Sequence, residues 1–157
     1  AVFDHGEICT GTLLTPRVVL TAAHCLGDDL PEVYVGSRLI QGHDVAVKRV
    51  SRYPHYCDTC TEAIRDFGVV VLAEDVTPVG GPLTVLASQD EWDATIDEGA
   101  EVTLVGYGEN GDASDPYAGA GTKRVVTTTI RSIAADGLEL LVGGSGRGTC
   151  EIGRAHV

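Results

Sequence analysis

Short runs of β-branched and other apolar residues recur along the chain, and turn-forming Gly, Pro and Asp residues separate them. Each run is too short for a helix of useful length, and β-branched residues favour extended backbone. The pattern therefore predicts an antiparallel all-β barrel or sandwich, with helix as a minor component. The expected strands cover residues 12–14, 18–21, 33–35, 45–50, 69–72, 102–105 and 125–133.

The composition is that of a folded protein, and it argues against two classes of partner. With 43% apolar and 22% charged residues, a chain of 157 residues can bury a core. The longest apolar run, around residues 69–72, is far shorter than the roughly 20 residues of a membrane-crossing helix. The net charge of −12 disfavours nucleic acid, because phosphate binding relies on clustered Lys and Arg. We expect neither a membrane nor a nucleic acid as partner.

The composition changes between residues 72 and 101. A stretch with Pro and Gly is followed there by acidic residues around the sole tryptophan, Trp92. This change predicts a connector between two β units. A second segment, 106–122, is rich in Gly, Asp and Ser and is predicted to be an exposed loop.

The most informative segment covers residues 9–25. Two short expected strands flank a Thr-Pro-Arg turn, and Cys9 and Cys25 stand at the ends. A hairpin could bring the two cysteines within bridging distance. His24, beside Cys25, would then have the fixed position that a general base needs. The alternative is a buried histidine with a structural role.

The run Leu-Thr-Ala-Ala-His-Cys at 20–25 closely resembles the histidine motif of the trypsin/chymotrypsin family of serine endopeptidases. Residues 9–14 resemble the strand that precedes this motif in the family. The resemblance implies that His24 is the general base and that Cys9 and Cys25 form a disulfide.

The family also has an aspartate followed by an apolar strand. Asp66, 42 residues after His24 and followed by Phe-Gly-Val-Val-Val-Leu, fits this pattern. The implied role of Asp66 is to accept the Nδ1 proton of His24 and so fix its tautomer. Alternatively, Asp66 caps a strand, since Asp is common at loop ends.

Further similarity extends the resemblance over about residues 9–150. Residues 102–108 resemble the family's strand that ends in Gly-Tyr-Gly, residues 123–133 its next long strand, and residues 51–56 the stretch before its aspartate. The implied fold is a double antiparallel β-barrel with an incomplete second barrel. The first barrel is expected at about 1–85, the connector at 86–100 and the incomplete second barrel at 101–151.

The resemblance ends at residue 151. Residues 146–151 resemble the family's sequence just before its nucleophile, which continues Gly-Asp-Ser-Gly-Gly-Pro, whereas this chain continues Ile-Gly-Arg-Ala-His-Val. DNA encoding 151–157 can contain the opening of a common short-read sequencing adapter, so we expect 152–157 to be a non-native tail. The nucleophilic serine is then absent from the chain, and Ser145 is a loop residue. The resemblance places Gly148 at the floor of the specificity pocket.

Five cysteines leave at least one without an intramolecular partner. Cys57 and Cys60 could form a metal site with His43 or His55, but a closed zinc site normally uses a second clear pair of ligands. We expect a small local disulfide between Cys57 and Cys60 and no metal. Cys150 resembles a family cysteine whose partner lies beyond the nucleophile.

These features imply that the intact parent is a secreted, monomeric serine endopeptidase that cleaves polypeptides through an acyl-enzyme and needs no cofactor. The chain itself is expected to be an inactive fragment. The alternative is a non-catalytic serine-protease homologue that uses the fold as a binding module.

Overall fold

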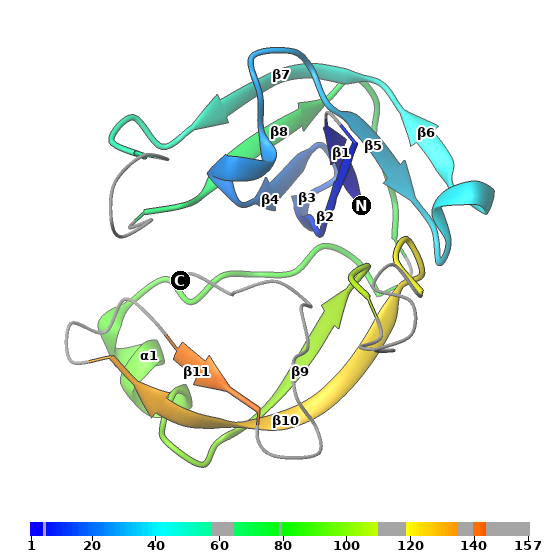
Figure 1. Ribbon diagram of the computed structural model, residues 1–157. Coiled ribbons are helices and arrows are strands. Elements are labelled where there is room, and N and C mark those ends of the chain that lie inside the picture. The colour runs from blue at the N-terminus through cyan, green and yellow to red at the C-terminus, as the bar shows by residue number, and fades with distance from the viewer. Residues whose placement is uncertain (5, 58–64, 79, 110–118, 135–139, 144–157) are drawn as a thin grey trace.

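The computed structural model describes residues 1–4, 6–57, 65–78, 80–109, 119–134 and 140–143. They form two β units, one above the other in Figure 1. The first unit holds β1 (Val2–Asp4), β2 (Glu7–Cys9), β3 (Thr12–Thr15), β4 (Val18–Thr21), η1 (Ala23–Cys25), β5 (Glu32–Val35), η2 (Leu39–Gln41), β6 (His43–Val45), β7 (Val47–Arg52) and β8 (Gly68–Leu72). The second holds α1 (Gln89–Thr95), β9 (Glu101–Gly106), β10 (Arg124–Ile133) and β11 (Leu140–Val142).

Two four-stranded antiparallel sheets build the first unit. Their strand orders are β2-β1-β5-β6 and β3-β4-β8-β7. Buried side chains from both sheets, together with Leu26 after η1, form one core. The core residues are Val2, Val19, Leu26, Val33, Val45, Val70 and Leu72. Because burial of each such side chain is worth about 1.5–3 kcal/mol, this core is the main stabilising feature of the unit.

The central strand of the second sheet is β8, which pairs with β4 on one side and β7 on the other. Its alternate residues Gly68, Val70 and Leu72 are buried, and Val69 and Val71 are half-buried. A strand covered on both faces reads as a continuous apolar run rather than as an alternating one. This explains why the longest apolar run of the sequence lies here.

The second unit contains a three-stranded antiparallel sheet of order β11-β10-β9. Along β10, exposed residues alternate with half-buried ones up to the buried Ile130. Several large apolar side chains of this half of the chain are exposed. They are Leu83, Val85, Leu86, Val105, Val125 and Leu141.

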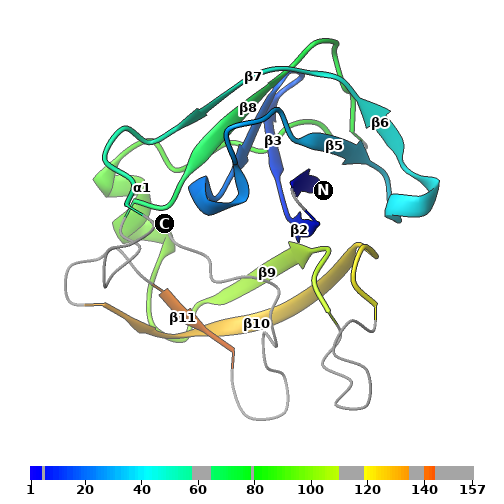
Figure 2. The ribbon, with the colours of Figure 1, turned by 45° about the horizontal axis from the view of Figure 1, so that its top comes forward.

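Hydrogen bonds join the two units just after β9 ends in the sequence. The backbone N–H of Tyr107 donates to Oγ1 of Thr10 (3.1 Å), and the Tyr107 hydroxyl donates to the carbonyl of Gly36 (2.5 Å). The backbone N–H of Lys123 donates to the carbonyl of Ser37 (2.8 Å). Figure 2 shows the end of β9 lying beside β2, as these bonds require.

The expected all-β class is confirmed, with four differences in detail. The run 45–50 is interrupted at residue 46, because β6 pairs with β5 in one sheet and β7 pairs with β8 in the other. The expected strands do not include β1, β2 or β11, and helix α1 lies within the expected connector. The expected loop 106–122 is not wholly exposed, since Tyr107 is buried and hydrogen-bonded to the first unit.

Candidate active site

His24 lies in η1, the short 3-10 helix that directly follows β4. Cys25 in the same turn is bonded to Cys9 at the end of β2, with a Cα–Cα distance of 6.1 Å. The backbone on one side of His24 is therefore tied to β2 by a covalent bond, and on the other side to the sheet through β4.

Strand pairing brings Asp66 to this histidine. In the β4–β8 ladder, Thr21 lies opposite Gly68. His24 follows Thr21 by three residues and Asp66 precedes Gly68 by two, so both lie just beyond the same end of the ladder. Antiparallel register, rather than proximity in sequence, therefore juxtaposes the two residues.

The Asp66 carboxylate accepts two hydrogen bonds from His24. The backbone N–H of His24 donates to Oδ1 at 2.9 Å, and the ring Nδ1 lies 2.5 Å from Oδ2. The Asp66 side chain is 2% exposed, whereas the His24 side chain is 52% exposed. The alternative of a buried structural histidine therefore does not describe His24. With Nδ1 engaged, Nε2 is the nitrogen available for proton transfer.

The residue before Asp66 has an unusual backbone conformation. Arg65 has a φ of 64°, and it is the one non-glycine residue with positive φ in the part of the chain that the structure describes. Left-handed backbone outside glycine is enriched in Asn and Asp, so an arginine at this position gives no sequence signal for the turn.

The cysteines and histidines do not provide a metal site among the described residues. Ligand atoms of Cys9, His24 and Cys25 lie within 4.8 Å of one another, but the two sulfurs are bonded to each other and are not thiolate donors. Cys57 is also disulfide-bonded, which removes the thiolate that the alternative metal site needed. Cys60, Ser145, Gly148 and Cys150 lie outside the described residues.

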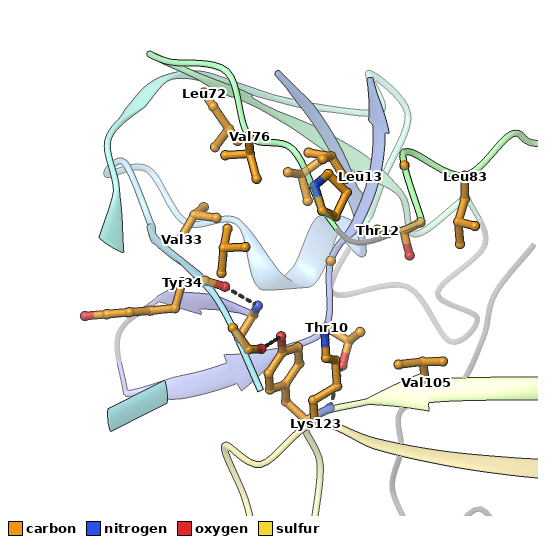
Figure 3. Close-up of a pocket in the computed structure, with 18 residues that line it drawn as sticks. Thr10, Thr12, Leu13, Val33, Tyr34, Leu72, Val76, Leu83, Val105 and Lys123 are labelled. Atoms are coloured by element: carbon orange, nitrogen blue, oxygen red, sulfur yellow. Dashed lines mark hydrogen bonds between the residues drawn. The ribbon is translucent and has the colours of Figure 1, made fainter. Parts of the chain in front are cut away.

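A separate cavity of about 320 Å³ lies at the junction of the two units, and neither His24 nor Asp66 lines it. Figure 3 shows its apolar wall, which includes Leu13, Val33, Leu72 and Val76 from the first unit and Val105 from β9, with Lys123 at its lower side. Because it is away from the His24–Asp66 pair, we do not assign the catalytic chemistry to it.

Burial shifts the pKa of two polar groups at this cavity. The Ala1 ammonium donates to the carbonyl of Tyr34 at 2.7 Å. Burial, and secondarily the charge of Lys123, lower the pKa of that ammonium to about 5. Burial also raises the pKa of the Tyr107 hydroxyl.

The chain is similar to known proteins over most of its length. The family model described as Trypsin matches residues 1–150. Trypsin 5G1 of Aedes aegypti is 33% identical over 114 residues, which cover 70% of this chain and 41% of the relative. The cercarial protease of Schistosoma mansoni is 30% identical over 125 residues, covering 69% of this chain and 47% of the relative.

Two further matches concern a venom enzyme and a solved structure. Snake venom serine protease Dav-KN of Deinagkistrodon acutus is 45% identical over 53 residues, covering 32% of this chain and 20% of the relative. The structure of neuropsin, a serine protease expressed in the limbic system of mouse brain, superposes with a TM-score of 0.75 at 19% identity. That match covers 99% of this chain and 74% of the neuropsin chain, and it shows a trypsin-like fold of two β-barrel-like units. The chain spans less than half the length of the first two curated relatives.

Proposed function

The chain belongs to the trypsin family, and we propose that its parent protein is a secreted serine endopeptidase in which His24 is the general base and Asp66 is its orienting carboxylate. The single observation that supports this most strongly is the pair of hydrogen bonds from His24 to one buried carboxylate. The disulfide and the match to a venom serine protease support an extracellular location. Within the described ranges, no helix has the length and apolar character needed to cross a membrane.

The proposed mechanism begins with proton transfer to Nε2 of His24. As a serine hydroxyl supplied by the parent attacks the peptide carbonyl carbon, Nε2 takes the hydroxyl proton and the carbonyl oxygen becomes an oxyanion. The tetrahedral intermediate then collapses, the C–N bond breaks, and the imidazolium returns the proton to the leaving amine. Water hydrolyses the resulting ester with His24 again as base.

Asp66 contributes through orientation and charge. Its Oδ2 accepts a hydrogen bond from the Nδ1–H group, which leaves the lone pair of the ring on Nε2. Its negative charge stabilises the imidazolium that forms in each half-reaction. Because the carboxylate is buried, the interaction is weakly screened by water.

We further propose that the 157-residue chain alone does not hydrolyse peptides. Among the described residues, no hydrogen bond joins the His24 ring to a serine hydroxyl.

Gly148, assigned to the specificity pocket by resemblance, would leave that position without a charge. The alternative function is a non-catalytic homologue, and a parent that has another residue in place of the nucleophilic serine would favour it.

The test is to express the full-length parent and to measure hydrolysis of fluorogenic peptides together with labelling by a serine-directed fluorophosphonate. We expect activity and labelling in the parent and neither in the 157-residue chain. In serine-protease triads, replacing the aspartate by asparagine lowers kcat by about 10⁴, because the histidine then holds the wrong tautomer. We expect a loss of that order for Asp66→Asn, with a similar or larger loss for His24→Ala. Full activity of either variant would contradict the assignment.

A further inference from the structure

The turn that carries Asp66 is conformationally unfavourable. Arg65 has left-handed backbone with a φ of 64°, and the N–H of Phe67 donates to the carbonyl of Arg65 at 2.9 Å, which closes a tight turn around Asp66. A bulky L-residue adopts this conformation only where surrounding contacts hold it. Contacts from outside the turn must therefore stabilise it.

Tyr53, just after β7, contacts both neighbours of Asp66. Its backbone N–H donates to the carbonyl of Phe67 at 3.0 Å, and its ring centroid lies 4.8 Å from that of Phe67. The guanidinium carbon of Arg65 lies 5.7 Å from the centre of the same ring. One aromatic side chain therefore lies against the residue on each side of the carboxylate.

We propose that Tyr53 is a positioning residue for Asp66, because its ring holds Arg65 and Phe67 in the turn that directs the carboxylate at His24. The proposal rests on the proposed function for its catalytic meaning, but the geometry it concerns can be measured without catalysis. The effect of the ring on Asp66 passes through the backbone on either side of the carboxylate.

Two atoms of His24 report on the position of the carboxylate. The His24 amide donates to Oδ1, and the Nδ1 proton lies against Oδ2. Amide hydrogen exchange and the low-field Nδ1 proton resonance, measured by NMR on the 157-residue chain, therefore detect any displacement of Asp66. The amide of Leu72, which donates to the carbonyl of Arg17 at 2.8 Å, reports on the first unit as a whole.

The variants are Tyr53→Ala and the matched control Tyr53→Phe, which keeps the ring and removes only the hydroxyl. Aromatic-pair and cation–π contacts together account for about a tenfold change in a local equilibrium. We expect Tyr53→Ala to accelerate exchange of the His24 amide about tenfold and to broaden or remove the Nδ1 resonance. Tyr53→Phe is expected to stay within about twofold of the unaltered chain, and Leu72 is expected to exchange alike in both variants.

Equal His24 exchange in Tyr53→Ala and Tyr53→Phe would overturn the proposal. If Tyr53→Ala also accelerates exchange of the Leu72 amide, the substitution has loosened the first unit as a whole. In that case the variants Arg65→Val and Arg65→Gly are compared instead. Valine opposes the left-handed backbone of the turn, whereas glycine permits it. Faster exchange of the His24 amide in Arg65→Val than in Arg65→Gly would show that the turn holds the Asp66 carboxylate in place. Equal exchange of the His24 amide in these two variants would overturn the proposal. If these tests fail in the 157-residue chain while the parent still loses activity on Asp66→Asn, the positioning role is removed and the proposed function stays intact.

Discussion

The carboxylate of Asp66 lies in a position that is almost inaccessible to water, where an unpaired charge would be strongly unfavourable. The backbone N–H and the ring Nδ1–H of His24 both donate to this carboxylate. Water cannot replace these two donors, because the carboxylate is buried. The same contacts that make the buried acid tolerable also hold the imidazole in one orientation. At this site, stability and the proposed chemistry therefore depend on the same atoms.

Ala1 leads to an expectation about pH. For a chain that starts at Ala1, the folded-state pKa of the ammonium, about 5, lies below its ordinary value of 8.0. Between these two values the unfolded state binds more protons, so stability rises with pH and becomes level above pH 8. We expect this group to contribute a slope of at most about 1.4 kcal/mol per pH unit, measured by urea unfolding across the window.

The matched control is the same chain with an acetylated N-terminus, which cannot titrate at Ala1. The two samples differ only at the N-terminal amine, so the difference between the two profiles isolates Ala1. Parallel profiles would show that the amine is not buried as described.

At the scale of elements, the sequence predicts best where one physical signal dominates. Strand β8 is identified by its continuous apolar run, because both of its faces are covered. Strand β10 is identified by alternation, because only one of its faces is covered. Strands β1 and β2 have three residues each, with acidic residues at Asp4 and Glu7, and owe their conformation to pairing with distant β5 and with each other. No local pattern contains that information.

The helix α1 does have a local signal in the sequence. Ser88 caps it by accepting from the N–H of Glu91, and the Glu91 side chain accepts from the N–H of Ala87. The sequence Ser-x-x-Glu is typical of such a helix start. For the site, the motif around His24 and the aspartate before β8 are both identifiable from sequence, whereas the turn at Arg65 depends on contacts with Tyr53 and is not.

Close packing between neighbouring strands makes Gly68 sensitive to substitution. A Cβ at this residue would lie 2.6 Å from Cδ1 of Leu26 and 3.0 Å from the carbonyl oxygen of Ser51. We expect Gly68→Ala to lower the free energy of unfolding by about 1–3 kcal/mol, measured by urea denaturation. Thr127→Ala, at an exposed position of β10, serves as control and should change it by less than about 0.5 kcal/mol.

The disulfide that ties β2 to η1 should contribute strongly to stability. Cys9 and Cys25 are 16 residues apart, and closing a loop of about 15 residues is worth about 3 kcal/mol in the chain-entropy description. We expect the double variant Cys9→Ala/Cys25→Ala to lose an amount of that order in guanidinium unfolding. An unchanged midpoint would mean that packing around η1 alone holds His24 in place.

At the scale of the whole molecule, Tyr107 joins the two units through its hydroxyl and its backbone. Tyr107→Phe leaves the carbonyl of Gly36 without this donor, and we expect a loss of about 1–3 kcal/mol in thermal or urea unfolding. Tyr34→Phe is the matched control, because the Tyr34 hydroxyl donates to Glu32 at the exposed surface. Equal losses in the two variants would contradict a special role for the Tyr107 bond.

The strand order β3-β4-β8-β7 has a consequence for biosynthesis. Every strand of this sheet, and both members of the His24–Asp66 pair, come from the first 72 residues. A ribosome releases the N-terminal half first, and domains generally fold as units in that order. The imidazole of His24 and the carboxylate of Asp66 can therefore come together while β9 and β10 are still being translated.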